Sequence, residues 1–216
     1  MSRFTHGVAE MVAEALASII RLMAGTVVVY PECGPGMLTA QSIFFANHSS
    51  HLDFVMLWSS LPRSARRKTR PVAAADYWGR DPIRRLLATH IFRSVLVQRG
   101  DDARDQATKL KNAEVLRQAL AAGESLILFP EGTRGDGRTV GPFRSGLYRL
   151  AQQWPEVQLV PVRLDNLNRI LPKGAVLPSV RRSRLTFRQP IAVCDGESKE
   201  EFLERARQAV TRNGQG

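Results

Sequence analysis

Apolar residues recur every three or four positions between residues 8 and 23, which is the spacing of one face of an α-helix. Glu14 and Arg21 lie on the other side of this helix, and Gly25 is placed to end it. An amphipathic helix of this kind either packs on its own domain or lies on a membrane surface, and the pattern leaves both alternatives open. The apolar stripe consists of Val8, Met11, Val12, Ala15, Leu16, Ile19, Ile20 and Met23.

After this helix, short β-branched or apolar runs alternate with longer segments of helical spacing. The short runs predict strands at residues 26–30, 42–46, 71–75, 94–98, 125–129, 158–163 and 184–188. The longer segments predict helices at residues 53–61, 82–90 (with Asp81 as its cap), 101–122, 143–152 and 197–212. Such alternation is typical of an α/β fold, so we expect a mainly parallel central sheet flanked by helices, with an N-terminal amphipathic helix. We divide the chain into that helix, residues 1–25, and one domain, residues 26–212.

The chain is strongly basic, with 31 Lys and Arg residues against 20 Asp and Glu residues and a net charge of +11. Such an excess favours anionic partners: nucleic acid, anionic lipid surfaces, phosphorylated substrates or an acidic carrier protein. Two basic clusters contribute to this charge, and each is either a solvated surface or a binding site for anionic groups. They are Arg63, Arg66, Arg67, Lys68 and Arg70, and, more weakly, Arg181, Arg182 and Arg184.

The sequence contains no stretch of about 18 or more uncharged apolar residues, so we expect no membrane-spanning helix. The N-terminus does not resemble a signal peptide, because Glu10 and Glu14 interrupt the segment that would have to be apolar. Cys33 and Cys194 lack the spacing of a metal or redox site, and we interpret them as reduced thiols of a cytosolic protein, with a disulfide as the alternative.

A polar segment, residues 47–53, follows the predicted strand at 42–46 and leads into the next predicted helix. His48 and Asp53 are five residues apart, which would not pair them on one helical face, but they can meet across a strand-to-helix turn. A carboxylate bonded to one imidazole nitrogen fixes the tautomer and leaves the other nitrogen as a general base for a hydroxyl. The alternative is a turn whose Asn, Ser and Asp side chains only cap the helix.

The predicted strand at 125–129 leads into a second polar segment, Phe129-Pro130-Glu131-Gly132-Thr133-Arg134. Gly132 allows a tight backbone turn, and Arg134 can bind a phosphate through two parallel hydrogen bonds. Glu131 can accept hydrogen bonds from hydroxyl groups or orient Arg134. The alternative is a turn that carries a surface ion pair.

Taken together, the two segments resemble a known family. The pattern Asn-His-x-x-x-x-Asp, followed about 80 residues later by Phe-Pro-Glu-Gly-Thr-Arg, is similar to that of the glycerolipid acyltransferases typified by 1-acylglycerol-3-phosphate acyltransferase. Two weaker blocks add to the resemblance: residues 91–99, which end in Arg99, and the apolar strand Leu159-Val160-Pro161-Val162. The resemblance covers about residues 42–164.

The resemblance implies that His48 abstracts the proton of an acceptor hydroxyl while Asp53 orients it, and that the alkoxide attacks an acyl thioester directly. The residues that would bind the substrate are Arg99, Glu131, Gly132, Thr133 and Arg134. The sequence has no Gly-x-Ser-x-Gly motif, which agrees with direct transfer.

We therefore predict an acyltransferase that moves a fatty acyl group from acyl-CoA or acyl carrier protein to a lysophospholipid, foremost 1-acylglycerol-3-phosphate, giving phosphatidic acid. We expect contact with a membrane surface and a cytoplasmic location at the inner face of the membrane. We expect no nucleic acid, no metal and no cofactor beyond the acyl donor. Acylation of another lyso-lipid and a basic membrane-binding protein without catalysis stay open as alternatives. The sequence leaves acyl chain length, the choice of donor and the oligomeric state open.

Overall fold

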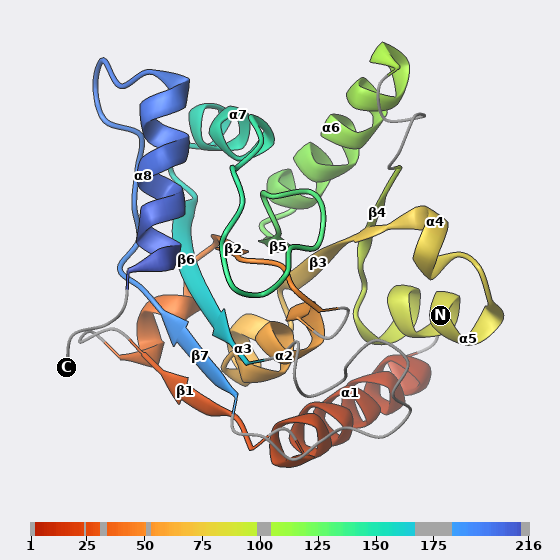
Figure 1. Ribbon diagram of the computed structural model, residues 1–216. Helices are drawn as coiled ribbons and strands as arrows, with labels where there is room; N and C mark the ends of the chain where they lie inside the picture. The colour runs from red at the N-terminus through yellow and green to blue at the C-terminus, as the bar shows by residue number, and fades with distance from the viewer. Residues whose placement is uncertain are drawn as a thin grey trace.

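The computed structural model describes residues 3–23, 25–30, 34–50, 53–98, 105–166 and 183–212, and within them a seven-stranded sheet forms the centre of the protein (Figure 1). The strands are β1 (Val27–Val29), β2 (Ser42–Ala46), β3 (Thr69–Ala74), β4 (Val95–Val97), β5 (Ser125–Leu128), β6 (Gln158–Asp165) and β7 (Arg184–Phe187). Their order is β1-β7-β6-β2-β5-β3-β4. The strands from β6 to β4 run parallel, whereas β7 is antiparallel to β6, and β1 runs parallel to β7. The predicted α/β class with a mainly parallel sheet is confirmed.

Helices cover both faces of this sheet. The helical elements are α1 (Arg3–Met23), η1 (Pro35–Thr39), α2 (Asp53–Ser60), α3 (Arg63–Arg66), α4 (Ala75–Trp78), α5 (Pro82–Leu86), η2 (Leu87–Ile91), α6 (Gln106–Ala121), α7 (Gly146–Gln153) and α8 (Lys199–Thr211). Side chains alternate along β2, so that Phe44 joins the core beneath α1 and α2, while Ile43 and Phe45 join the core beneath α6, α7 and α8 (Figure 1). Two apolar cores therefore hold the helices onto the sheet.

Most predicted elements occur, with boundaries shifted by a few residues. The helix predicted at 82–90 begins at Pro82, and the Asp81 carboxylate caps it by accepting the Arg84 backbone N–H at 2.8 Å. It is regular α-helix only to Leu86 and continues as the π-helical η2. Some predictions fall on residues outside the described part of the chain. These include Cys33, Arg99, Arg181 and Arg182, residues 51 and 52 of the polar segment, and the first four residues of the helix predicted at 101–122.

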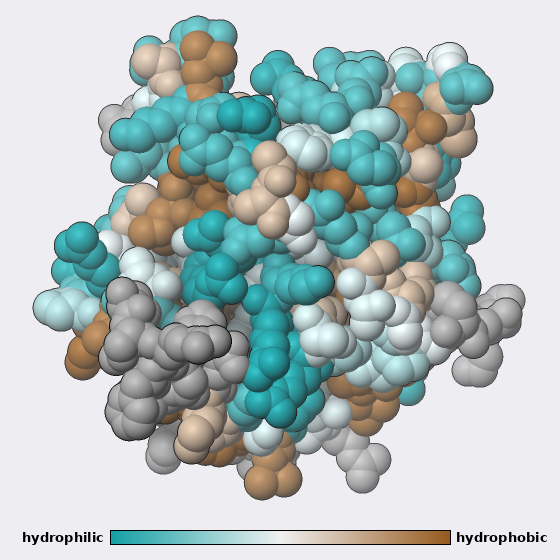
Figure 2. All heavy atoms as spheres, turned by 180° about the vertical axis from the view of Figure 1, so that it is seen from behind, coloured by the Kyte–Doolittle hydropathy of each residue, from teal (hydrophilic) through white to brown (hydrophobic). Residues whose placement is uncertain are grey.

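Helix α1 carries apolar side chains on two faces. On one face Ala17 is fully buried, and Ala13, Leu16 and Ile20 pack against the core that contains α2. The other face is exposed, with accessible fractions of 72% for Met11, 48% for Val12, 53% for Ile19 and 84% for Leu22. Apolar atoms also remain at the surface along the lower edge of the molecule, on the side where α1 lies (Figure 2). Among the described residues, no helix is long and apolar enough to cross a membrane.

The basic run at residues 63–70 forms α3 and the start of β3, and Arg63, Arg67 and Lys68 within it are exposed. Arg66 is buried, with 4% of its side chain exposed, and donates to the backbone carbonyl oxygens of Ser59 at 2.9 Å and Leu61 at 3.1 Å. It also donates to the Glu14 carboxylate of α1 at 2.5 Å. Arg70 pairs with Glu124 at 2.8 Å. Long-range partners within the chain therefore hold these two arginines in place.

We expect Arg66→Ala to lower the free energy of unfolding by about 2 kcal/mol, since it leaves buried carbonyl groups without donors and removes the ion pair to α1. The matched control is Arg63→Ala. Arg63 also contacts Glu14, at 3.5 Å, but 60% of its side chain is exposed, and we expect a change within about 0.5 kcal/mol. Urea denaturation of both variants measures the difference. Equal midpoints would show that Arg66 does not fasten α1 to the domain.

Candidate active site

His48 and Asp53 meet across the turn that joins β2 to α2. Nδ1 of His48 lies 2.9 Å from Oδ2 of Asp53, and the same oxygen accepts the backbone N–H groups of Ser49 at 2.6 Å and Ser50 at 2.8 Å. Asp53 is fully buried, so the turn closes around its carboxylate. A carboxylate oxygen can only accept, so Nδ1 is the donor, and in the neutral imidazole the free lone pair is then on Nε2. The pairing that the sequence predicted is confirmed.

The imidazole of His48 opens into a cavity of about 410 Å³. One of its faces stacks on Phe129, with ring centroids 4.3 Å apart and an interplanar angle of 22°. Arg80 and Arg134 line the same cavity. Its remaining walls come from Phe54, Val72, Ala73, Ala74, Asp76, Tyr77 and Trp78. A cavity of this size, lined by an imidazole and two guanidinium groups, suits a small anionic ligand that carries a hydroxyl.

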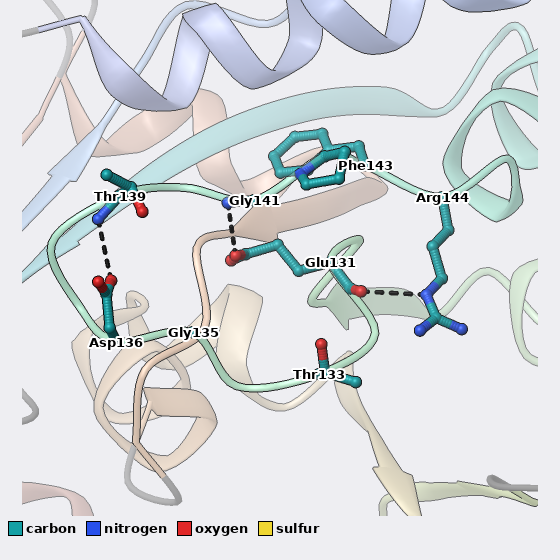
Figure 3. Close-up of a pocket in the computed structure, with 9 residues that line it drawn as sticks. Glu131, Thr133, Gly135, Asp136, Thr139, Gly141, Phe143 and Arg144 are labelled. Atoms are coloured by element: carbon teal, nitrogen blue, oxygen red, sulfur yellow. Dashed lines mark hydrogen bonds between the residues drawn. The ribbon is translucent and has the colours of Figure 1, made fainter.

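The second polar segment reaches His48 because β5 is the neighbour of β2 in the sheet, and the carboxyl ends of parallel neighbours meet at one edge. Glu131 is 7% exposed, and its Oε1 accepts the His48 backbone N–H at 2.7 Å. Its Oε2 accepts the Gly141 N–H at 2.8 Å (Figure 3). The Gly135 N–H donates to the His48 carbonyl oxygen at 2.8 Å. The loop from 131 to 141 therefore holds both backbone polar groups of His48.

Gly132 adopts a left-handed conformation, with φ of 72°. A Cβ atom there would also lie 2.5 Å from Nε of Arg144, so only glycine fits without displacing that arginine. Arg144 donates from Nε to the Glu131 carbonyl oxygen at 3.1 Å (Figure 3). The sequence interpretation missed Arg144 and assigned it to a helix at 143–152. Nothing in its local pattern distinguishes it from the other arginines of this basic chain.

Two more hollows flank this loop. Thr133, Glu131 and Arg144 line a cavity of about 390 Å³ (Figure 3). A groove of about 210 Å³ lies between the sheet and the helices α6 and α7, and its apolar walls include Leu116, Leu147 and Leu150. Phe129 lines both this groove and the His48 cavity, and Arg144 also lines the groove. A mainly apolar groove therefore adjoins the cavity that His48 lines.

The other residues of the predicted motifs are placed as follows. Asn47 is buried and bonds to Leu164 of β6 twice, donating to its carbonyl oxygen at 2.9 Å and accepting its N–H at 2.8 Å. Thr133 and Arg134 are exposed. Residues 159–162 form a continuous buried stretch of β6. Arg99, whose predicted role is in substrate binding, lies outside the described residues.

Residues 35–165, more than half of the chain, match the family model described as Acyltransferase, and the chain belongs to that family. Its relatives include the 1-acyl-sn-glycerol-3-phosphate acyltransferases of Chlamydomonas reinhardtii, at 28% identity over 106 residues, and Limnanthes alba, at 29% over 136 residues. These alignments cover 49% and 62% of this chain but 31% and 44% of the relatives. The chain thus spans less than half the length of these two relatives.

The fold also matches a solved structure, the crystal structure of the 1-acyl-sn-glycerophosphate acyltransferase PlsC from Thermotoga maritima. The TM-score is 0.69 at 18% identity, and the match covers 93% of this chain and 76% of that chain. The family resemblance stated from the two sequence motifs is confirmed by the family match.

Proposed function

We propose that this protein transfers a fatty acyl group from an acyl thioester to the free hydroxyl of 1-acylglycerol-3-phosphate, giving phosphatidic acid. The observation that carries the proposal is the contact of His48 with the buried Asp53, beside a cavity that both His48 and Arg134 line. A histidine held in this way acts as a general base near neutral pH. The names of the relatives from Chlamydomonas reinhardtii and Limnanthes alba support the same acceptor.

In the proposed reaction, Nε2 of His48 takes the proton of the acceptor hydroxyl as its oxygen bonds to the thioester carbonyl carbon. The Asp53 carboxylate stabilises the imidazolium that forms. The carbon–sulfur bond then breaks, and the departing thiolate receives that proton. The products are the new ester and the free thiol of the donor, so no acyl-enzyme is needed.

The surroundings of His48 suit the two substrates. Arg134 and Arg80 line its cavity and favour the phosphate of the acceptor. The groove beyond Phe129 offers leucine and valine side chains to an acyl chain, with Arg144 among its lining residues. We assign the headgroup to the cavity and an acyl chain to the groove.

The test is acyl transfer by the purified protein to 1-acylglycerol-3-phosphate, with acyl-CoA and acyl carrier protein compared as donors. Formation of phosphatidic acid with either donor supports the proposal and identifies the donor. Release of free fatty acid alone would show a hydrolase instead. Activity only with another lyso-lipid would support acyl transfer as the reaction but reject 1-acylglycerol-3-phosphate as the acceptor.

We also propose that the exposed face of α1 rests on the inner, cytoplasmic face of a membrane, where a lipid acceptor is found. Deleting the helix would not test this, because its other face belongs to the core. We expect the double substitution Met11→Ser and Leu22→Ser to weaken binding to phospholipid vesicles at least about tenfold while the melting temperature is unchanged. Leu110→Ser is the control, since Leu110 on α6 is 62% exposed. Equal vesicle sedimentation of both variants would reject α1 as the contact.

A further inference from the structure

We infer that Glu131 is a positioning residue for His48 rather than a ligand of the acceptor, an inference that rests on the proposed role of His48 as the base. The Glu131 carboxylate is buried, and backbone N–H groups occupy both of its oxygens. One N–H belongs to His48 and the other to Gly141, which lies on the far side of the loop (Figure 3). A substrate hydroxyl would have to compete with these two bonds.

Both partners of Glu131 are donors, and this explains why a carboxylate is required. A carboxylate accepts through either oxygen, so it satisfies two N–H groups at once. An amide of the same shape has one accepting oxygen and one donating nitrogen. In either orientation it would place an N–H against an N–H, leaving His48 or Gly141 without an acceptor.

The consequence for catalysis lies in the placement of the imidazole. The His48 backbone is held on one side by Glu131, through its N–H, and on the other by Gly135, through its carbonyl oxygen. Asp53 and Phe129 then fix the ring. A displacement of about 1 Å in a reacting group can cost about a hundredfold in rate, so loss of the Glu131 anchor acts on the chemical step.

Steady-state kinetics with 1-acylglycerol-3-phosphate separate positioning from binding. We expect Glu131→Gln to lower kcat about 10- to 100-fold while KM for the acceptor changes less than about twofold. A residue that held the acceptor would raise KM instead. A raised KM with kcat unchanged would overturn the inference.

A second variant keeps the carboxylate and moves it. A Cβ atom on Gly141 would lie 3.0 Å from Oε2 of Glu131, so Gly141→Ala pushes the carboxylate without removing its charge. We expect this variant to reproduce the fall in kcat in weaker form. The matched control is Gly36→Ala, where a new Cβ meets nothing within 4 Å, and kinetics like those of wild type are expected. Wild-type kcat in Gly141→Ala would count against the inference.

Amide hydrogen exchange at His48, measured by NMR, provides a readout that does not need activity. The His48 N–H should exchange slowly in wild type and at least about tenfold faster in Glu131→Gln. If wild type fails to acylate this acceptor with either donor, the proposed function is rejected and exchange alone decides the role of Glu131. Equal exchange in both proteins would overturn the inference, whatever the activity.

Discussion

Replacing His48 with alanine is expected to lower kcat/KM for acyl transfer about a thousandfold, because the acceptor hydroxyl then loses its general base. Asp53→Asn should lower kcat/KM by less, about a hundredfold. An amide oxygen can still accept from Nδ1 of His48, Ser49 and Ser50, but it cannot stabilise the imidazolium by charge. Because the two residues act as one unit, the double variant should be no slower than His48→Ala alone.

The matched control for this series is His90→Ala, since His90 is exposed on η2 and does not line the His48 cavity. Its activity should equal that of wild type. Initial rates of phosphatidic acid formation, with circular dichroism to check folding, give the measurement. Losses in the double variant that multiply those of the single variants would show that the pair does not work together.

Arg134→Ala should act on binding of the acceptor rather than on the chemical step. A guanidinium bound to a phosphate contributes about 2 kcal/mol, so KM for 1-acylglycerol-3-phosphate should rise about 30-fold. Arg134→Lys should recover part of this loss, because lysine keeps the charge but not the paired donors. KM for a lyso-lipid acceptor without a phosphate should be the same in wild type and in both variants.

Arg138→Ala is the control for Arg134. It removes an exposed arginine from the same loop, one that lines none of the three hollows around His48. Its KM should stay close to that of wild type. A similar rise in both variants would indicate that the loop attracts the acceptor by its overall charge, and that Arg134 makes no specific contact.

The features that depend on local sequence patterns were predicted most accurately. The predicted strand at 42–46 is β2 residue for residue, because a short apolar run ends there at polar residues. The His48–Asp53 contact could be predicted because it spans a single turn. By contrast, the pattern of apolar residues in a strand does not indicate which strand it pairs with or whether the pair is parallel. The antiparallel pairing of β7 with β6 and the parallel pairing of β1 with β7 could therefore not be predicted.

Long-range partners account for most of what the sequence did not reveal. Arg66 and Arg70 bond to Glu14 and Glu124, which are 52 and 54 residues away, so their run looked like a free basic surface. Glu131 bonds to backbone N–H groups, and every residue except proline has one, so no side-chain motif could indicate these bonds. The apolar spacing of α1 predicted one stripe, whereas packing divides it between the core and the surface.

The adjacency of β2 and β5 also has a consequence for how the protein is made. His48 leaves the ribosome before Glu131, which bonds to its N–H and lies 83 residues later. Leu164, which bonds to Asn47, follows Asn47 by 117 residues. A nascent chain that ends before residue 131 therefore contains His48 without the groups that hold its backbone. Because contacts between residues this far apart in sequence form late in folding, we expect His48 to reach its final geometry only when most of the domain has been synthesised.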